Sequence, residues 1–468
     1  MGEAAMNENR IVVVGGGASG TILAVHLLRN GPPSLRVAIV EHRAVVGAGI
    51  AYSTDEPDHL LNTRASGMSA FPDDPDHFWR WLVATSRAEA LGCDGSFCFV
   101  PRRVYRDYLG ELVAPFLAPG GRLSLIEGTC TDIRPVRGGV AIDLSDGRTE
   151  VAGLAVLATG YCEPSVEAGS RIIGPWSGIG AFPVGRDDDV VILGTGLSMV
   201  DNVATLRRRG HRGTITAISR RGLLPQRHAP SVPLRLDAAD VPFGTAPAYL
   251  MRWLRRTVRW ASEAEGRGWR DVVDALRPHT QGLWQSLSPE GRRSFLRHAR
   301  TLWEVHRHRM APAAAEGLEA ALADGHLRIV TGRVIETASD AQAAVLSVRE
   351  RGTGTVREIR GDWLIDCMGI LRDPASGSGQ LVARLIEAGR ARLDPLRIGL
   401  DVTADGAVVD AHGVACDRLF AVGPVTRARF WEVTAIPDIR VQCAELGTHL
   451  VRLLPRAASE APTLRRTV

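Results

Sequence analysis

The chain has 468 residues, of which 45% are hydrophobic and 23% charged. This composition is typical of a globular protein of two to three domains, and it excludes disordered, collagen-like and coiled-coil proteins. The formal net charge is +4, and all 56 basic residues are arginines. The chain therefore has no lysine for a pyridoxal phosphate Schiff base or a Walker-type phosphate site.

Charge and hydropathy also limit the partners and the location. Like charges never run longer than three residues, which indicates no nucleic-acid partner. No stretch of 18 uninterrupted apolar residues occurs, and the N-terminus lacks a signal-peptide pattern. We therefore expect a cytoplasmic protein that does not span a membrane.

The seven cysteines are odd in number and scattered, which argues against a disulfide framework. Cys93 and Cys98 have the C-x4-C spacing of dithiol flavoenzymes but not the Gly-Gly-Thr-Cys context of that motif. We therefore do not expect a redox-active pair. The spacing of cysteines and histidines indicates no zinc site, so we expect no metal.

The first nucleotide-binding pattern begins at residues 10–14, a β-branched run typical of a buried parallel strand. A Gly-Gly-Gly-Ala-Ser-Gly loop follows at 15–20, then a helical stretch at 21–29, a strand at 35–40 and an acidic residue. Such glycines permit a tight turn, the approach of a pyrophosphate and close helix–strand packing, while the acid binds ribose hydroxyls. The predicted dinucleotide-binding residues are Gly15, Gly17, Ala18, Ser19, Gly20, Glu41 and His42.

A second pattern starts with a strand at 190–193 and continues with a helix at 200–209 and a strand at 214–219. Met199 replaces the third glycine, so we expect helix and strand to lie farther apart here. The second strand ends without an acid, and arginines at that place favour the 2′-phosphate of NADPH unless they are ordinary solvated charges. The predicted residues of this site are Gly194, Gly196, Leu197, Ser198, Ser219, Arg220 and Arg221.

Each unit has a returning strand. Residues 123–160 and 327–369 each read as a small meander that closes on a buried strand ending in glycine. A further strand at 416–423 precedes a helix at 433–454, and such a junction can hold a phosphate or a ring edge. The predicted contacts to the cofactors at these strand ends are Ala158, Thr159, Gly160, Gly369, Gly423 and Pro424.

These patterns predict an α/β fold with two Rossmann-like dinucleotide-binding domains and a helical insertion. The FAD-binding domain is expected to comprise residues 1–165 and 371–468. The NADPH-binding domain is expected to comprise 166–230 and the returning strands at 323–370. The insertion would span 231–322.

The chain resembles the two-dinucleotide-binding-domain flavoproteins, in which FAD occupies the first site and NAD(P)H the second. Ala158-Thr159-Gly160 is similar to their Ala-Thr-Gly motif and 419–423 to their last FAD motif, although Pro424 stands where many members carry Asp. A closer resemblance is to the bacterial FAD/NAD(P)-binding protein family, related to flavin-dependent N-hydroxylating monooxygenases. The stretches that carry it are 49–53, 59–62, 68–75, 99–103, 196–201, 219–225, 305–309 and 430–437. The Phe-x-Gly-x-x-x-His signature of Baeyer–Villiger and dimethylaniline monooxygenases is missing.

The helical insertion carries half of the ten tryptophans. They can pack helix on helix, or form a lid over a substrate that excludes water. His306, His308 and Arg309 are candidates for binding an anion, either a cofactor phosphate or a substrate carboxylate, with surface charge as the alternative. Trp431 and Glu432 follow the last FAD strand and are the candidate catalytic residues, with a structural role as the equal alternative.

The leading hypothesis is an NADPH-dependent flavin monooxygenase that uses FAD and O2. A flavin peroxide would oxygenate a small nucleophilic substrate such as an amine or amino acid. The alternatives are an oxidoreductase that passes electrons to another acceptor, and a flavin redox sensor without turnover. The glycine patterns encode nucleotide binding and leave the chemistry and the oligomeric state open.

Overall fold

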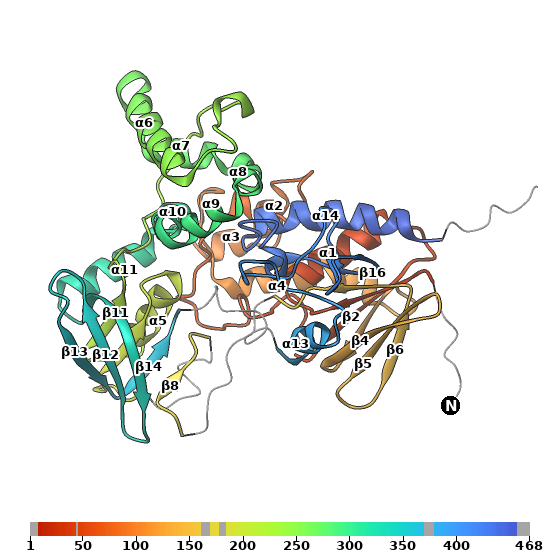
Figure 1. Cartoon of the computed structure of the whole chain (residues 1–468), viewed down its shortest axis with the longest axis horizontal. Helices are drawn as coiled ribbons and strands as arrows, with labels where there is room; N and C mark the ends of the chain where they lie inside the picture. Colours follow the sequence, from red (N-terminus) through yellow and green to blue (C-terminus); the bar gives the residue numbers. More distant parts are fainter. Residues whose placement is uncertain (1–7, 44, 161–168, 177–183, 369–378, 456–468) are drawn as a thin grey trace, which may run out of the picture.

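The computed structural model describes residues 8–43, 45–160, 169–176, 184–368 and 379–455. Two sheets built around parallel strands lie toward opposite ends of the long axis, and a group of helices stands above them (Figure 1). This architecture confirms the predicted α/β class with two Rossmann-like units and a helical insertion.

The first sheet has the strand order β15-β16-β7-β1-β2-β3, and all neighbours are parallel except at the β15 edge. Its central strands are buried apolar runs, as expected where both faces of a parallel sheet are covered. α1 (Ala18–Asn30) packs against α14 (Ile436–Leu453) and α4 (Arg102–Leu117). The strands are β1 (Arg10–Val14), β2 (Arg36–Glu41), β3 (Leu123–Glu127), β7 (Leu154–Leu157), β15 (Ala407–Val409) and β16 (Ala415–Ala421).

The second sheet has the order β13-β12-β11-β10-β9-β14-β8. β11 changes partner along its length, because 327–331 pair in parallel with β10 and 332–339 pair antiparallel with β12. α5 (Leu197–Arg208) and α11 (Pro312–Ala323) pack together beside this sheet. The strands are β8 (Ile172–Ile173), β9 (Val190–Leu193), β10 (Ile215–Ser219), β11 (Leu327–Ser339), β12 (Ala344–Glu350), β13 (Val356–Gly361) and β14 (Trp363–Asp366).

A separate three-stranded antiparallel sheet consists of β4 (Cys130–Val136), β5 (Gly139–Leu144) and β6 (Thr149–Ala152). The prediction that residues 123–125 belong to this meander is wrong. β3 instead pairs in parallel with β2, Leu123 lying opposite Val37. The local alternation of strands and turns could not reveal this, because register in a parallel sheet depends on distant partners.

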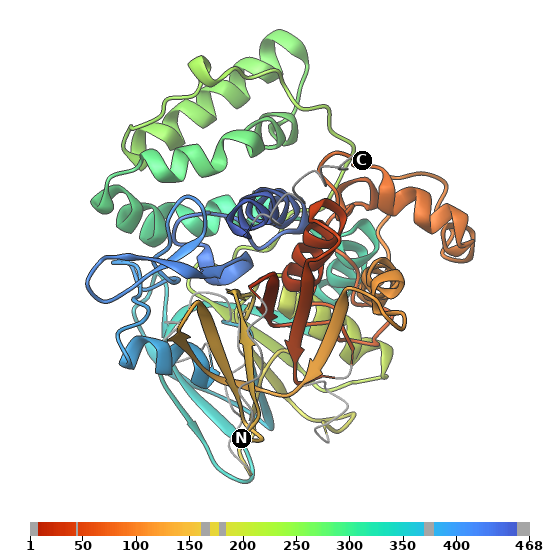
Figure 2. The same cartoon turned by 90° about the vertical axis from the view of Figure 1, so that its right-hand side faces the viewer.

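The helical insertion lies outside both sheets (Figure 2). A five-residue π-helical segment, η4 (Phe295–Ala299), joins two short helices and interrupts the helical run at 289–307. The helices of the insertion are α6 (Pro247–Glu265), α7 (Trp269–Ala275), α8 (Thr280–Ser286), α9 (Pro289–Ser294) and α10 (Arg300–Arg307). The remaining α-helices are α2 (His77–Ala84), α3 (Arg87–Ala90) and α13 (Gly379–Glu387).

The cysteines correct one prediction. Cys93 and Cys98 form a disulfide, with their Cα atoms 5.7 Å apart, although the sequence does not favour one. Four others, Cys130, Cys367, Cys416 and Cys443, are free thiols. In the described part of the chain, no group of three or more His, Cys, Asp or Glu side chains could hold a metal ion. Among the described helices, none is long and apolar enough to cross a membrane.

Candidate cofactor sites

The first glycine loop lies where β1 ends, and its backbone approaches two neighbours too closely for a side chain. Gly15 has φ +111°, and a Cβ there would lie 2.4 Å from the carbonyl oxygen of Ala158. A Cβ on Gly20 would lie 2.0 Å from the Gly15 carbonyl oxygen. The sequence-predicted roles of these glycines in turn formation and helix packing therefore match the geometry.

The same loop leaves the start of α1 open to an anion. Gly17 is the N-cap of α1, and no described side chain caps the helix. The first N–H groups of α1, from Ala18 onward, therefore point away from the helix without a side-chain partner. α1 begins at Ala18, three residues earlier than predicted, so Ala18 and Ser19 belong to its first turn. A helix N-terminus of this kind binds phosphate groups.

Glu41 is the last residue of β2, and its carboxylate contacts the first glycine loop. Its carboxylate accepts hydrogen bonds from the Gly16 N–H at 2.8 Å and from the Arg43 N–H at 3.1 Å. His42 Nδ1 lies 2.9 Å from the same carboxylate. Arg43, which the sequence patterns missed, donates to the Gly49 carbonyl oxygen at 2.6 Å. Glu41 thus stands beside the phosphate-binding turn, the position from which an acid reaches a ribose.

A buried hydroxyl group at the end of β7 makes no hydrogen bond to the described residues. The Thr159 hydroxyl is buried and has no partner among the described residues. Next to it, Gly160 has φ +62°, and a Cβ there would meet nothing within 4 Å. Buried polar atoms are nearly always paired, so an orphan beside open space fits a bound polar group. These residues therefore fit the FAD that the motifs imply.

The turn after β16 contacts the first turn of α1. Gly423 has φ +78°, and a Cβ there would lie 2.4 Å from the Ser19 hydroxyl oxygen. The Gly423 N–H donates to Gln442 on α14, whose amide donates to the Thr426 hydroxyl at 2.9 Å. Pro424 is the second residue of the 3-10 turn η6 (Gly423–Thr426). Sequence patterns missed Gln442 and Thr426, because their contacts join a helix to a turn 16 residues earlier.

The second glycine loop repeats the geometry of the first. Gly194 has φ +101°, and a Cβ there would lie 3.1 Å from the Cys367 carbonyl oxygen at the end of β14. Gly196 is the N-cap of α5, without a described side-chain cap, and a Cβ there would meet nothing within 4 Å. Leu197 and Ser198 form the first turn of α5. Gly369 lies outside the described residues.

The residues predicted to read a 2′-phosphate lie after β10. The Ser219 hydroxyl accepts from the Gly222 N–H at 3.0 Å and lies 3.0 Å from the Thr195 hydroxyl. Arg220 is exposed. Arg221 donates to the carbonyl oxygen of His298 in the helical insertion at 2.9 Å. The Ser219 hydroxyl is therefore used in hydrogen bonds to Gly222 and Thr195, whereas Arg220 is exposed to solvent.

The residues after the last FAD strand contact the insertion. Trp431 stacks on Trp284 of α8, with ring centroids 4.5 Å apart, and meets Phe295 edge to face at 5.5 Å. Glu432 has φ +70°, and its carboxylate accepts from Arg307 of α10 at 3.0 Å and from the Trp303 indole. Both candidate catalytic side chains are thus buried and held by the insertion.

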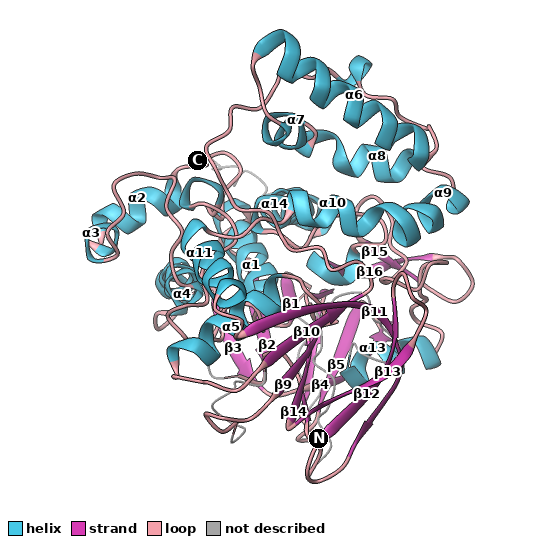
Figure 3. Ribbon diagram, turned by 90° about the vertical axis from the view of Figure 1, so that its left-hand side faces the viewer, coloured by secondary structure: helices cyan, strands magenta, loops and turns pink. Residues whose placement is uncertain are grey.

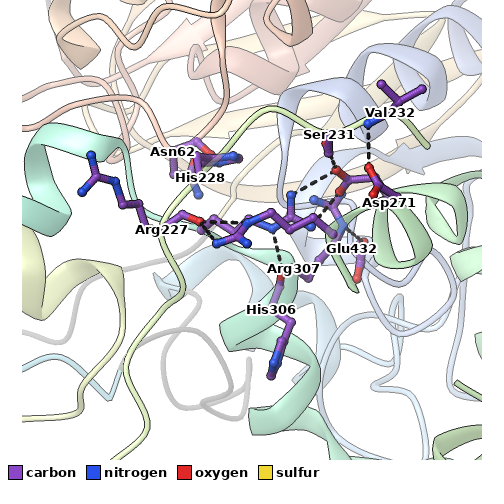
Figure 4. A network of polar contacts seen from close by, with 12 residues as sticks. Asn62, Arg227, His228, Ser231, Val232, Asp271, His306, Arg307 and Glu432 are labelled. Atoms are coloured by element: carbon purple, nitrogen blue, oxygen red, sulfur yellow. Dashed lines mark hydrogen bonds and ion pairs between the residues drawn. The ribbon is translucent and has the colours of Figure 1, made fainter. Parts of the chain in front are cut away.

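His306 lies in a polar network between the insertion and the first unit (Figure 4), and Arg309 donates to its carbonyl oxygen at 2.8 Å. Arg309 is buried and makes two hydrogen bonds to Asp274, at 2.8 and 3.0 Å. Burial raises the pKa of Asp274, but hydrogen bonds from Arg309 and Ser231 outweigh it and hold that pKa below its usual range. The carboxylate of Asp274 therefore already balances the charge of Arg309. This pairing favours a structural role over the anion-binding role that the sequence suggested.

The two histidines near Arg309 differ. His306 Nδ1 lies 2.8 Å from the Leu302 carbonyl oxygen, and its ring meets Trp269 edge to face. Burial and the neighbouring Arg307 charge lower the pKa of His308 to about 3. His308 is therefore neutral at physiological pH and has no charge to offer an anion.

Two further histidines, the buried His59 and the partly buried His228, join the two nucleotide-binding units. His59 bridges Thr54 and Thr205 of α5, at 2.8 and 2.9 Å. His228 Nε2 lies 3.0 Å from the carbonyl oxygen of Asn62. Burial lowers the pKa of His59 and of His228 to about 4. Nearby, Arg102 and Asp201 form a buried ion pair at 2.7 Å across the same junction. His59, Arg102 and Asp201 lie in stretches that carry the family resemblance, but the sequence analysis assigned them no role.

The fold and these loops define two Rossmann-like units, each with a glycine loop that leads into a helix without a described side-chain cap. Residues 12–162 match a family model described as FAD-NAD(P)-binding, which confirms the predicted resemblance for that part of the chain. A comparison with curated proteins finds no match.

Several solved structures have the same fold over nearly the whole chain. The ornithine N-hydroxylase of Kutzneria sp. 744, with reduced FAD, NADP+ and L-ornithine, is 17% identical with TM-score 0.63, covering 94% of this chain and 98% of that one. L-lysine 6-monooxygenase from Pseudomonas syringae is 15% identical with TM-score 0.62, covering 95% and 99%. The FAD-bound cadaverine monooxygenase from Erwinia amylovora is 13% identical with TM-score 0.60, covering 96% and 97%. At these identities the likeness establishes the fold.

Proposed function

We propose that this protein is an FAD-dependent, NADPH-using monooxygenase that oxygenates a small amine or amino acid with O2. The observation that carries this proposal is the pairing of two glycine loops, each followed by an uncapped helix, within one chain. The fold of that chain matches amine-oxygenating enzymes over 94% or more of its length.

In the first site, the α1 N-terminus would hold the FAD pyrophosphate and Glu41 the ribose hydroxyls. The partnerless Thr159 hydroxyl would complete a hydrogen bond to the cofactor. Gly423 and Pro424 would border the flavin, because the end of β16 touches the first turn of α1. In the second site, the α5 N-terminus would hold the NADPH pyrophosphate.

When bound, FAD would supply the redox chemistry of hydride acceptance and oxygen activation. The chain supplies orientation and shielding from water. Trp431, stacked on Trp284, would form an apolar wall. Glu432 is fixed by Arg307 and Trp303. These contacts support a positioning role for Glu432, in which it sets the place of the α10 side chains.

The substrate would lie between the insertion and residues 430–432. The contacts of Arg309 and His308 do not support direct substrate binding by either residue, so the proposal leaves them as supports of the insertion. A cytoplasmic location remains part of the proposal.

The test uses the purified full-length chain. We expect it to retain FAD, to oxidise NADPH, and to form a hydroxylamine from one member of a panel that includes ornithine, lysine, cadaverine and acidic amino acids. Oxygen from ¹⁸O₂ should appear in that product. The Gly17→Ala variant is the control, because the added Cβ narrows the phosphate approach and should remove FAD.

Three outcomes would contradict the proposal in different ways. Rapid NADPH oxidation coupled to an external electron acceptor, without labelled product, indicates an electron-transfer oxidoreductase. FAD binding without reduction by NADPH indicates a sensor. A colourless protein that binds no FAD would remove the first site altogether.

A further inference from the structure

The outer face of α6 carries a stripe of positive charge. Four arginines follow the spacing i, i+3, i+4, i+7, which places them on one side of a helix. All four are exposed, and none forms an ion pair with a described carboxylate. The stripe consists of Arg252, Arg255, Arg256 and Arg259.

Two aromatic side chains flank this stripe. Tyr249 is 40% exposed and Trp260 is 52% exposed. The Arg256 guanidinium lies over the Tyr249 ring, 5.8 Å from its centroid. The eleven-residue separation of the two aromatics is close to three helical turns, so both lie along the same edge, about 16 Å apart. We call the four arginines with Tyr249 and Trp260 the α6 outer face.

The opposite side of α6 is already occupied. Ala261 is fully buried, and Leu254 and Val258 pack in a cluster with Val272 and Ala275 of α7. Figures 1 and 3 show α6 at the outer edge of the insertion, with the other helices of the insertion between it and the sheets. The apolar side of α6 therefore belongs to the core of the insertion, and the charged side faces outward.

The stripe contrasts with other arginine runs in the chain. Arg207, Arg208 and Arg209 at the end of α5 pair with Asp324, Glu56 and Asp58. On α6, like charges three and four residues apart repel one another by a few tenths of a kcal/mol per pair. Repulsion between the arginines of the outer face therefore lowers the stability of the isolated helix slightly. An anionic partner would offset this repulsion.

We propose that the α6 outer face is a docking surface for an acidic protein partner that presents a carboxylate-rich helix or patch. Arg, Tyr and Trp are the residue types that dominate binding energy at protein–protein interfaces. Carboxylates opposite the four arginines would give electrostatic complementarity and a salt-dependent association rate.

Two other macromolecules fit the surface less well. A membrane-surface helix inserts its apolar side between lipids, whereas the apolar side of α6 is packed inside the insertion. A nucleic-acid surface usually extends its basic groups along a longer track, whereas these four span about 10 Å of helix. An acidic protein surface matches both the short length and the aromatic edge.

A bound partner would act close to the candidate site. Leu250 of α6 packs against the cluster that contains Trp284 and Trp431. The side of α6 opposite the docking surface therefore contacts the cluster that contains Trp431. The docking proposal itself rests on α6 alone and does not depend on the proposed oxygenation.

The test measures binding of a fluorescent helical peptide with four glutamates on one face at the i, i+3, i+4, i+7 spacing. Its matched peptide has glutamines at those positions. We expect the glutamate peptide to bind at least about tenfold more tightly, and added salt to weaken it. The variant R252Q/R255Q/R256Q/R259Q should lose this binding, and Trp260→Ala should weaken it.

The matched control is R328Q/R333Q/R349Q/R360Q, which removes four exposed arginines from β11, β12 and β13 instead. Both quadruple variants should unfold at the wild-type denaturant midpoint, since surface changes of this kind cost little. The proposal is overturned if the control loses binding equally, or if both peptides bind alike. It is also overturned if anionic phosphatidylglycerol vesicles or duplex DNA bind more tightly than the peptide through the same arginines. Self-association that only the α6 variant abolishes would make this face a contact between copies of the chain.

Discussion

The two nucleotide-binding units use the same first glycine and then diverge. Gly15 and Gly194 have φ +111° and +101°, and each approaches the backbone at the end of its returning strand. Each donates its N–H to the second strand, Gly15 to Val40 at 2.9 Å and Gly194 to Ile218 at 2.8 Å. The turn geometry is therefore common to both units, and it is independent of which nucleotide binds.

The divergence lies at the third position of the loop and at the end of the second strand. Gly20 fits only as glycine, whereas Met199 is fully buried and packs in the core of the second unit. Glu41 binds the first loop through a charged carboxylate, whereas Ser219 binds the second through a hydroxyl. The proposal that the two units bind different nucleotides rests on these differences beside a common turn.

The largest effect should come from adding a Cβ to one glycine in each loop, because the two glycines differ in the space around them. Gly20→Ala should unfold the first unit or cost more than about 3 kcal/mol, because its Cβ would lie 2.0 Å from backbone. Gly196→Ala should leave the free energy of unfolding within about 0.5 kcal/mol of wild type, because nothing lies within 4 Å. Its NADPH affinity should nevertheless fall, since the Cβ occupies the cofactor side. Urea unfolding and NADPH titration measure these two effects, and equal stability losses in the two variants would show that the space around the added Cβ does not set the cost.

The coenzyme preference of the second unit should depend on the arginines after β10. Replacing Arg220 and Arg221 by glutamine should weaken NADPH about ten- to a hundredfold and NADH much less, as charge-assisted bonds to a phosphate are lost. Arg333→Gln with Arg349→Gln is the control in the same unit. If NADPH and NADH weaken equally, the arginines do not read the 2′-phosphate.

The junction between the units should weaken in acid. The pKa of His59 and of His228 falls from 6.5 to about 4 on folding, so protonation favours the unfolded chain. Their stabilisation is complete above about pH 6.5 and is lost as the pH falls toward 4, costing about 2 kcal/mol each at pH 5. His59→Gln with His228→Gln should therefore show a smaller loss of stability between pH 7 and 5 than wild type. The exposed His412→Gln variant should behave like wild type, and identical pH dependence in all three proteins would refute the effect.

The smallest effect tests the orphan hydroxyl that distinguishes the first returning strand. Thr159→Val keeps the shape and removes a buried group without a described partner. The protein without FAD should be as stable as wild type or more so, while FAD should dissociate a few-fold faster, consistent with one bond of about 1 kcal/mol. Met368, the exposed residue at the matching place in the second unit, is the control, and Met368→Ala should not change FAD release. Unchanged FAD release in Thr159→Val would mean that the hydroxyl does not face the cofactor.

Much of the fold could be predicted from sequence because its signals are local. The glycine loops, the apolar strands before them and the strand ends at 160 and 423 each depend on backbone sterics within a few residues. Helix starts were displaced by three residues in α1 and α5, since the glycine that ends the loop is also the N-cap. The π-helical segment in the insertion carried no pattern that periodicity could detect.

The amino-acid sequence by itself determined the two-unit α/β plan, the positions of both glycine loops and the absence of an acid after the second one. Only the tertiary structure decided what the long-range side chains do. It placed β3 in the first sheet, bound Arg309 to Asp274, and fixed Glu432 between Arg307 and Trp303. It also joined the units through His59 and left the α6 arginines exposed. The physical reason is that charge pairing and burial depend on groups distant in sequence, whereas turns depend on neighbours along the chain.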